Sequence, residues 1–406
     1  MERDKVTPNY VLITSMNFPS GGAGATYLNL FCRGMKANGR SVEVVLLKGH
    51  AFGNYKYTGP RKNITEDGIP YRYMGFVQRP DRSFLKIFEE LISICRLIIY
   101  LFSLISRSQP FRFLIFNSEL QYNAPVMTFS RIFKVKVIKF VAEIIDKSEF
   151  SNSIFGHIKR FGYNLNYKHL NKKSDKLLVF SIYLKNFYVG LGYDENKIMV
   201  QPNLTDFDFW KPEFNDIKYT FGYSGAPYLK DGLNDLFKAI SLLNSDNLNI
   251  SLLVIGDATF GKSLIPSLKE ECAKLGISEK VFFTGLVEHS MVKQHLSECK
   301  ILAITRPSTL QTKAGFPTKL GEYFATMRPV LATNFGDMEV YFKDGTDIVM
   351  AECGNPESIA LKIKFMLENP GDVESISKRG YDTAHQLLEY KTSVNRMINF
   401  IESGMA

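Results

Sequence analysis

Short apolar runs alternate with longer segments of helical periodicity along the whole chain. The runs cover residues 11–14, 41–47, 113–117, 135–141 and 176–181 in the first half, and 219–223, 250–255, 281–284, 301–304, 330–332 and 348–350 in the second. The helical stretches between them include residues 26–38, 232–243 and 318–327. Strands that alternate with helices are typical of mostly parallel sheets covered on both faces. We therefore predict two α/β domains.

The domain boundary is predicted near residues 202–212, which gives an N-terminal domain of residues 1–205 and a C-terminal domain of residues 206–385. A length of 406 residues fits two domains of ordinary size. The last segment, residues 372–401, has a helical pattern and can pack against either domain. Its end, residues 386–406, is a candidate to pack back on the N-terminal domain.

Residues 83–106 form an unusually apolar stretch. Its run over residues 91–105 is interrupted by Arg96 and falls short of the ~20 apolar residues that a membrane span needs. Basic residues flank the stretch, namely Arg79, Arg82, Lys86, Arg107 and Arg112. A helix lying in an anionic membrane interface has this arrangement. A buried helix of the first domain explains the apolar run equally well, so both interpretations stay open, and a membrane-spanning helix is the least expected.

The two halves of the chain differ in charge. Residues 1–205 contain 29 Lys and Arg against 15 Asp and Glu, net +14, and the remainder contains 21 against 26, net −5, which together give the total of +9. A basic domain points to an anionic partner, such as nucleic acid, a phosphorylated substrate or a membrane surface. The apolar share of 45% and the charged share of 22% exclude a disordered or coiled-coil chain.

The cysteines and the N-terminus bear on the cellular compartment. Five scattered cysteines, without a CxxC pair or clustered histidines, do not predict a disulfide framework or a metal site. The first residues are charged and lead directly into an apolar strand, unlike a signal peptide. We expect a cytoplasmic protein in a reducing environment.

The loop of residues 21–25, GGAGA, lies between a predicted strand and a predicted helix. Its bare backbone amides and the helix N-terminus suit a phosphate group, although a tight turn also explains the glycines. A dinucleotide fingerprint starting at Gly22 would need a third glycine where Tyr27 stands. It would also need an acidic residue where the second strand ends in Leu47 and Lys48. An NAD or FAD site is therefore not expected.

Two stretches of the second half carry the strongest chemical signals. In GYSGAPYLKDGLND, residues 222–235, Lys230 precedes a helix start, where a cation and a helix N-terminus together suit a diphosphate. A solvated surface lysine is the plainer explanation. In residues 306–333 a Gly/Pro loop enters a short helix that carries Glu322 in its first turn. Such a carboxylate can accept both hydroxyls of a ribose, or merely favour the helix dipole.

These residues together resemble a known family. YSGAPYLKDGL, VIG at residues 254–256, FFTGLV at 282–287 and GFPTKLGEYFATMRPVLAT followed by GDMEVYFKDG are similar to the nucleotide-sugar domain of family 4 glycosyltransferases. The resemblance implies the GT-B architecture, in which two Rossmann-like domains face each other across a cleft. It also implies transfer of a sugar from a nucleotide diphosphate donor, with retention at the anomeric carbon and without a bound metal or other cofactor.

Carried over position by position, the resemblance assigns Lys230 to the donor diphosphate and Glu322 to the ribose. The implied donor-binding residues are Gly21, Gly22, Gly225, Thr284, Gly285, Arg306, Phe316, Pro317 and Thr318. The family's arginine shortly before the diphosphate lysine is missing, and Arg306 or Lys313 is a candidate to replace it. The family's first glutamate, eight residues before Glu322, is Ala314 here, which leaves the donor sugar undefined.

The acceptor site is expected in the first domain. Glu143 and Asp146 follow an apolar strand, near where a cleft-facing carboxylate is expected. Asp146 is our candidate for acceptor binding or for the catalytic base, and Glu119 is a similar but weaker candidate. Among the histidines only His50 stands where it can face the cleft. A retaining reaction does not require a protein base, because the departing phosphate oxygen can take the proton from the acceptor.

The sequence thus predicts a retaining glycosyltransferase that uses a nucleotide diphosphate sugar, with UDP or GDP as the expected nucleotide. A basic first domain suits a lipid-linked or glycan acceptor, as in O-antigen, capsule or exopolysaccharide assembly, with peripheral contact to an anionic membrane. Two alternatives stay open, a nucleotide-sugar 2-epimerase and a non-catalytic nucleotide-sugar-binding scaffold. Nucleic-acid binding is not expected, because the basic residues are not interleaved with aromatic residues on a known module.

Overall fold

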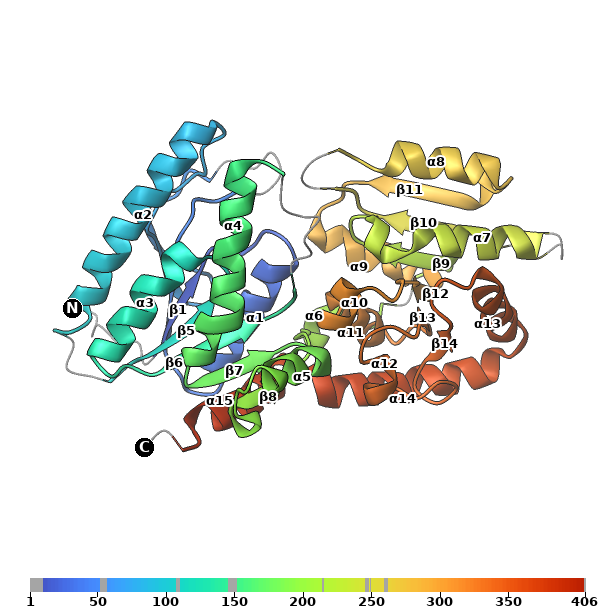
Figure 1. The fold of residues 1–406 in the computed structure, drawn as a ribbon. Helices are drawn as coiled ribbons and strands as arrows, with labels where there is room; N and C mark the ends of the chain where they lie inside the picture. Colours follow the sequence, from blue (N-terminus) through green and yellow to red (C-terminus); the bar gives the residue numbers. More distant parts are fainter. Residues whose placement is uncertain are drawn as a thin grey trace. The chain divides into compact units, whose positions relative to one another are not determined.

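The computed structural model divides into two compact units, which are Met1–Pro202 with Tyr390–Ala406, and Asn203–Glu389. The structure describes residues 10–51, 57–106, 110–144, 152–213, 215–244, 248, 250–258 and 262–404. Each unit consists of a sheet with helices on its faces (Figure 1).

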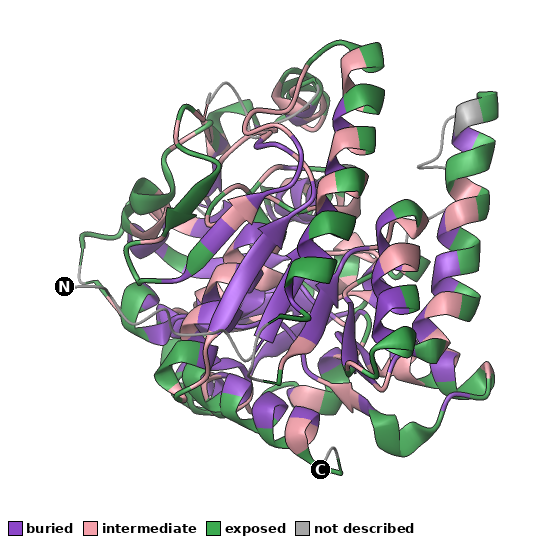
Figure 2. Cartoon of the chain, turned by 90° about the vertical axis from the view of Figure 1, so that its left-hand side faces the viewer, coloured by how far each residue is buried: buried purple, intermediate pink, exposed green. Residues whose placement is uncertain are grey.

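The first unit contains an eight-stranded sheet in the order β3-β4-β2-β1-β5-β6-β7-β8. Its strands are β1 (Tyr10–Thr14), β2 (Val42–Leu46), β3 (Lys62–Ile64), β4 (Pro70–Tyr73), β5 (Arg112–Phe116), β6 (Val137–Val141), β7 (Lys176–Val179) and β8 (Ile198–Val200). All neighbouring strands are parallel except β3 and β4. The central strands are almost entirely apolar and buried, as a parallel sheet covered on both faces requires (Figure 2).

The helices of the first unit cover both faces of this sheet. They are α1 (Ala23–Ala37), α2 (Ser83–Ser103), α3 (Leu120–Ile132), α4 (Ile154–Leu165), α5 (Ile182–Gly190) and α15 (Tyr390–Glu402). Val11 and Ile13 of β1 share a core with α2 and α3. On the other face, Tyr27 of α1 packs its ring against Phe116 and Phe180. Helix α15 packs against α1, so the end of the chain belongs to the first unit.

The second unit contains a six-stranded sheet, entirely parallel, in the order β11-β10-β9-β12-β13-β14. Its strands are β9 (Tyr219–Ser224), β10 (Leu252–Ile255), β11 (Val281–Gly285), β12 (Cys299–Ile304), β13 (Val330–Thr333) and β14 (Val349–Ala351). Its helices are α6 (Phe207–Trp210), α7 (Leu233–Asn244), α8 (Ile265–Lys274), α9 (His289–Ser297), α10 (Leu310–Ala314), α11 (Thr318–Ala325), α12 (Met338–Tyr341), α13 (Pro356–Glu368) and α14 (Pro370–Leu388). One apolar core lies on each face of the sheet.

The prediction of alternating strands and helices is confirmed, but it did not include three strands. Strand β3 is exposed, and β3 and β4 both contain polar residues, so neither forms an apolar run like those of the other short strands. Strand β8 has three residues at the edge of the sheet. The helical pattern over residues 372–401 corresponds to two helices, because the chain breaks at Glu389 into α14 and α15, which belong to different units.

Residues 83–106, for which a buried, an interfacial and a membrane-spanning helix were considered, contain helix α2. In the described part of the chain no helix has the length and the apolar character needed to cross a bilayer. The helix buries one side, with Leu97 and Leu101 in the core of the first unit, and leaves Ile99 and other large apolar residues exposed. The helix is therefore buried in the first unit on one side only.

Candidate functional site

The carboxyl ends of β9 and β12 form the centre of the candidate site in the second unit. Strand β9 lies in the middle of the sheet. Strands β10 and β11 follow it on one side, and β12, β13 and β14 follow on the other side. The loops that follow two such neighbouring strands diverge, which leaves a crevice at the carboxyl ends where α/β sheets bind ligands. The loop after β9 carries Gly225 and Asp231, and the loop after β12 carries Arg306.

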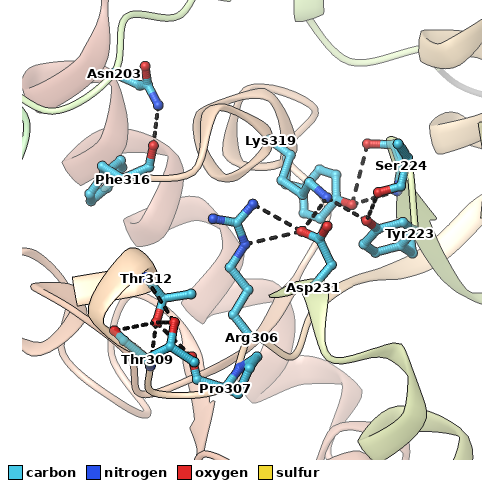
Figure 3. Close-up of polar contacts among 12 residues, drawn as sticks. Asn203, Tyr223, Ser224, Asp231, Arg306, Pro307, Thr309, Thr312, Phe316 and Lys319 are labelled. Atoms are coloured by element: carbon cyan, nitrogen blue, oxygen red, sulfur yellow. Dashed lines mark hydrogen bonds and ion pairs between the residues drawn. The ribbon is translucent and has the colours of Figure 1, made fainter. Parts of the chain in front are cut away.

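Two cationic side chains converge on one buried carboxylate at this point (Figure 3). Arg306 donates to Asp231 Oδ1 from Nη2 at 3.0 Å and from Nε at 3.2 Å. Lys319, in the first turn of α11, donates from Nζ to the same oxygen at 3.1 Å and to the hydroxyl of Tyr223 at 2.7 Å. The Lys319 ammonium also lies 4.0 Å from the centre of the Tyr223 ring. One carboxylate thus faces two cations, which leaves a net positive cluster.

Burial sets the protonation behaviour of this cluster. The side chain of Asp231 is 2% exposed, and those of Arg306 and Lys319 are 14% and 12% exposed. Burial lowers the pKa of Lys319 to about 8, although Asp231 favours its charged form. Burial also opposes ionisation of Asp231, but Lys319 and Arg306 together hold the pKa of that carboxyl below its usual value. At neutral pH the Asp231 carboxyl and most of the Lys319 ammonium are therefore charged.

Two glycines allow the loops to approach each other. Gly225 has φ +108°, and a Cβ added there would lie 3.3 Å from Lys319 Nζ. Gly232 has φ +70°, and an added Cβ would lie 1.8 Å from the carbonyl oxygen of Thr305. The hydroxyl of Thr305 donates to the Gly232 carbonyl at 2.9 Å and ties the two loops together. Glycine is required at both positions because a side chain would collide or strain the backbone.

Glu322 lies on α11 one turn after Lys319. The prediction that it belongs to the first turn is wrong, since the helix begins at Thr318 and its first turn contains no acidic residue. The side chain is half-buried, and desolvation raises the pKa of Glu322 to about 7, although the Lys319 charge lowers it. Close to neutral pH this carboxyl therefore exchanges between a hydrogen-bond donor and a double acceptor.

The turn before α11 contains Phe316, Pro317 and Thr318. The Phe316 carbonyl accepts a hydrogen bond from the side-chain amide of Asn203 (Figure 3), which fixes the direction of the turn. The N-cap residue of α11 is Pro317, and no side chain caps the helix. The amides of the first turn, together with the positive end of the helix dipole, favour an anion here.

The diphosphate lysine expected from the sequence, Lys230, does not belong to the buried cluster. It lies in a short 3₁₀ turn, half-exposed, and within the described residues its ammonium has no hydrogen-bond or ion-pair partner. Lys313, the other candidate to replace the missing arginine, is exposed. Arg306 is therefore the arginine that the fold brings to the crevice. Ala314, which stands at the position of the family's first glutamate, is completely buried.

Thr284 and Gly285 end the neighbouring strand β11. The Thr284 hydroxyl accepts from the Gly256 amide at 3.0 Å and donates to the Gly285 carbonyl at 2.8 Å. Gly285 itself has φ +71°. These contacts tie the end of β11 to the end of β10, on the same sheet edge as Asp231.

The first unit positions Gly21 and Gly22 after β1, as the sequence indicated. Gly21 has φ +123° and Gly22, the N-cap of α1, has φ +92°, so both occupy conformations that favour glycine. Asn17 in the same loop exchanges two hydrogen bonds with the backbone of Ala51, at 2.7 and 3.0 Å. The loop is therefore fixed to the segment that follows β2.

The acceptor candidates of the first unit have different environments. Asp146 lies outside the described residues, and Glu143 is exposed. Glu119 forms an ion pair with Lys48, at the carboxyl ends of β5 and β2. His50 is buried, which lowers its pKa. Near Glu119, Lys139 is buried and donates to the Asn117 carbonyl, and burial lowers the pKa of that lysine to about 7.

Sequence reasoning missed Asp231, Lys319 and Tyr223. One signal was available for Lys319, because a cation in the first turn of a helix opposes the helix dipole and needs a compensating anion. Within the described ranges, no group of three or more His, Cys, Asp or Glu residues has an arrangement suited to a metal ion.

Residues 205–383 match the family model of the group 1 glycosyl transferases. This group 1 segment lies in the second unit and contains Asp231, Arg306 and Lys319. A curated relative, an uncharacterized glycosyltransferase of Methanocaldococcus jannaschii, is 26% identical over 218 residues. That match covers 53% of this chain and 56% of the relative, so the chain spans about half the length of the relative it matches.

Solved structures resemble nearly the whole chain. HepE of Anabaena, solved in complex with UDP, has a TM-score of 0.72 and 16% identity, and the match covers 97% of this chain and 100% of HepE. WaaG, a glycosyltransferase involved in lipopolysaccharide biosynthesis, has a TM-score of 0.66 and 13% identity, with coverage of 97% and 100%. These likenesses concern the fold and confirm the predicted GT-B architecture of two Rossmann-like domains.

Proposed function

We propose that this protein is a retaining glycosyltransferase that uses a nucleotide diphosphate sugar, with UDP or GDP as the nucleotide. The observation that carries the proposal is the convergence of Arg306 and Lys319 at the carboxyl ends of β9 and β12, beside the uncapped start of α11. Two cations and a helix N-terminus match the charge of a diphosphate. The group 1 match of the same segment supports it, as do HepE structures that contain UDP and UDP-glucose.

In the proposed reaction, the bond between the anomeric carbon and the diphosphate oxygen breaks while the acceptor oxygen attacks from the same face. The acceptor proton passes to the departing phosphate oxygen, and a nucleoside diphosphate leaves. Negative charge grows on the diphosphate as the bond breaks, and Arg306 and Lys319 stabilise it within a largely buried site. No metal ion or cofactor is assigned to this reaction. Glu322 is proposed to accept the ribose hydroxyls.

The acceptor is proposed to be a lipid-linked or glycan molecule in surface polysaccharide assembly, at the cytoplasmic side of a membrane. The excess of 14 positive charges in residues 1–205 suits an anionic or lipid-linked acceptor. The likeness to WaaG supports this class of pathway.

A donor panel tests the proposal. Thermal shift and slow donor hydrolysis are measured for the purified protein with UDP, GDP, ADP and dTDP sugars. We expect stabilisation and hydrolysis with one nucleotide, loss of both in Glu322→Ala, and a partial loss in Lys230→Ala. Lys313→Ala, an exposed neighbour of the site, is the matched control and should behave like the wild type.

Two outcomes distinguish the proposal from its alternatives. Nucleotide-sugar binding without hydrolysis, and without transfer to a membrane extract, would indicate a non-catalytic scaffold. No response to any donor, with or without the extract, would overturn the transferase proposal.

A further inference from the structure

Helix α2 carries a stripe of large apolar side chains that face solvent. The stripe consists of Phe84, Ile87, Phe88, Leu91, Ile98, Ile99 and Phe102, whose exposed fractions range from 38% to 69%. Their spacing repeats every three or four residues, so they lie along one side of the helix. A helix of 21 residues is about 30 Å long. The stripe is thus an apolar ridge along the length of α2.

The polar groups of α2 point away from the stripe. The Arg96 guanidinium, which interrupts the apolar run in the sequence, donates to the carbonyl oxygens of Met74 and Gly75 at 3.2 and 3.0 Å. Glu89 and Ser93 are completely buried on the inner side. The helix is therefore apolar on its exposed side, and a buried face cannot explain the stripe, because the buried face is the opposite one.

The apolar surface continues on the neighbouring helices. Helix α3 packs between α2 and α4, and the ring of Phe133, just after α3, lies 6.1 Å from the ring of Phe102. Helix α4 exposes Ile154, Ile158 and Phe161, each by at least 61%. Figure 2 shows exposed residues along the outer sides of the two long helices that rise from this unit. Soluble domains rarely leave so large an apolar surface without a partner.

Exposed basic residues border this surface at the helix ends. They are Arg82, just before α2, and Arg131 and Lys134, on either side of Phe133 at the end of α3. Arg112, which the sequence placed in the same group, instead contacts the ring and hydroxyl of Tyr10 inside the unit. A second copy of the chain would place like charges opposite each other, whereas anionic lipid headgroups would neutralise them.

We infer that the exposed stripe of α2, together with the apolar residues of α4, inserts into the headgroup region of an anionic lipid bilayer. The basic border would contact the phosphate groups while the apolar side chains enter the acyl boundary. The inference deepens the proposed function and rests on it for the lipid-linked acceptor alone. Binding to lipid needs neither donor nor acceptor, so the two can fail separately.

Cys95 provides a probe within the stripe. It is exposed, it lies four residues after Leu91 and three before Ile98, and the other free cysteines are buried or half-buried. An environment-sensitive fluorophore on Cys95 of the full chain should shift to shorter wavelengths with vesicles that contain phosphatidylglycerol. The shift should be weaker with phosphatidylcholine alone and with high salt. The control carries the fluorophore at Leu361→Cys in a Cys95→Ser background, at an exposed site of the second unit.

Charged substitutions on the stripe complete the test. The pair Phe84→Glu and Leu91→Glu should weaken vesicle binding at least about tenfold, and Arg82→Glu about fivefold, with unchanged melting temperatures. Leu361→Glu should bind like the wild type. An unresponsive Cys95 probe, or glutamate variants that bind like the wild type, would overturn the inference. So would a dimer of the wild type that the stripe variants convert to monomers without loss of vesicle binding.

Discussion

The Lys319→Met substitution tests whether the buried cation binds the donor or only neutralises its neighbour. Lys319 makes charge-assisted contacts with Asp231 and Tyr223 in a largely buried site. A charge-assisted hydrogen bond contributes about 1.5–3 kcal/mol, and about 1.4 kcal/mol corresponds to tenfold in affinity. If the ammonium contacts the diphosphate, the dissociation constant for UDP at pH 7 should rise about 10- to 150-fold.

If Lys319 only neutralises Asp231, stability and UDP affinity should be lost and recovered together. Lys319→Met leaves the buried Asp231 with Arg306 as its remaining cationic partner, so a loss of about 1–3 kcal/mol of stability is expected. The double variant Lys319→Met with Asp231→Asn removes the uncompensated charge and should recover that stability. We expect the double variant to bind UDP as weakly as the single variant.

Calorimetric titration with UDP and thermal unfolding are the measurements, and Lys313→Met is the matched control because Lys313 is exposed on the preceding helix. Recovery of UDP affinity together with stability in the double variant would refute the reasoning. Lys319 would then be a positioning residue that only neutralises Asp231.

Three further predictions concern Lys319, Gly232 and Glu402. Because the pKa of Lys319 is about 8, its charge is lost as the pH rises further, and UDP affinity measured by titration should fall above that pH in the wild type but not in Lys319→Met. Gly232→Ala should lower the free energy of unfolding, measured by chemical denaturation, by about 3 kcal/mol or more, because its Cβ would collide with a carbonyl oxygen. Gly276 has a similar φ and no neighbour within 4 Å, so Gly276→Ala should lower it by about 1 kcal/mol. Hydrogen bonds from Arg40 lower the pKa of Glu402 to about 2, although burial opposes the shift. The ionised Glu402 carboxylate therefore stabilises the first unit fully above its usual pKa of 4.5. That stabilisation is lost as the pH falls toward 2. Glu402→Gln should therefore cost about 1–2 kcal/mol at pH 7, and calorimetry should find that its difference from the wild type disappears on acidification.

The sequence by itself determined the elements of the fold. Strand and helix patterns arise from residues close together in the chain, because the side-chain periods of two and 3.6 residues are local properties. The glycine loop after β1 and the turn before α11 were recognised for the same reason, since a turn depends on a few adjacent residues. Strands β3 and β4 were not, because their polar residues interrupt the apolar run that marks a buried strand.

Only the tertiary structure decided which charges meet. Asp231 is 75 positions from Arg306 and 88 from Lys319, and the order of β9 and β12 in the sheet brings them together. Lys230, adjacent to Asp231 in sequence, instead lies half-exposed outside the cluster, because successive residues of a turn point in different directions. The sequence likewise showed that α2 is apolar, but the packing of its inner side decided which residues face solvent.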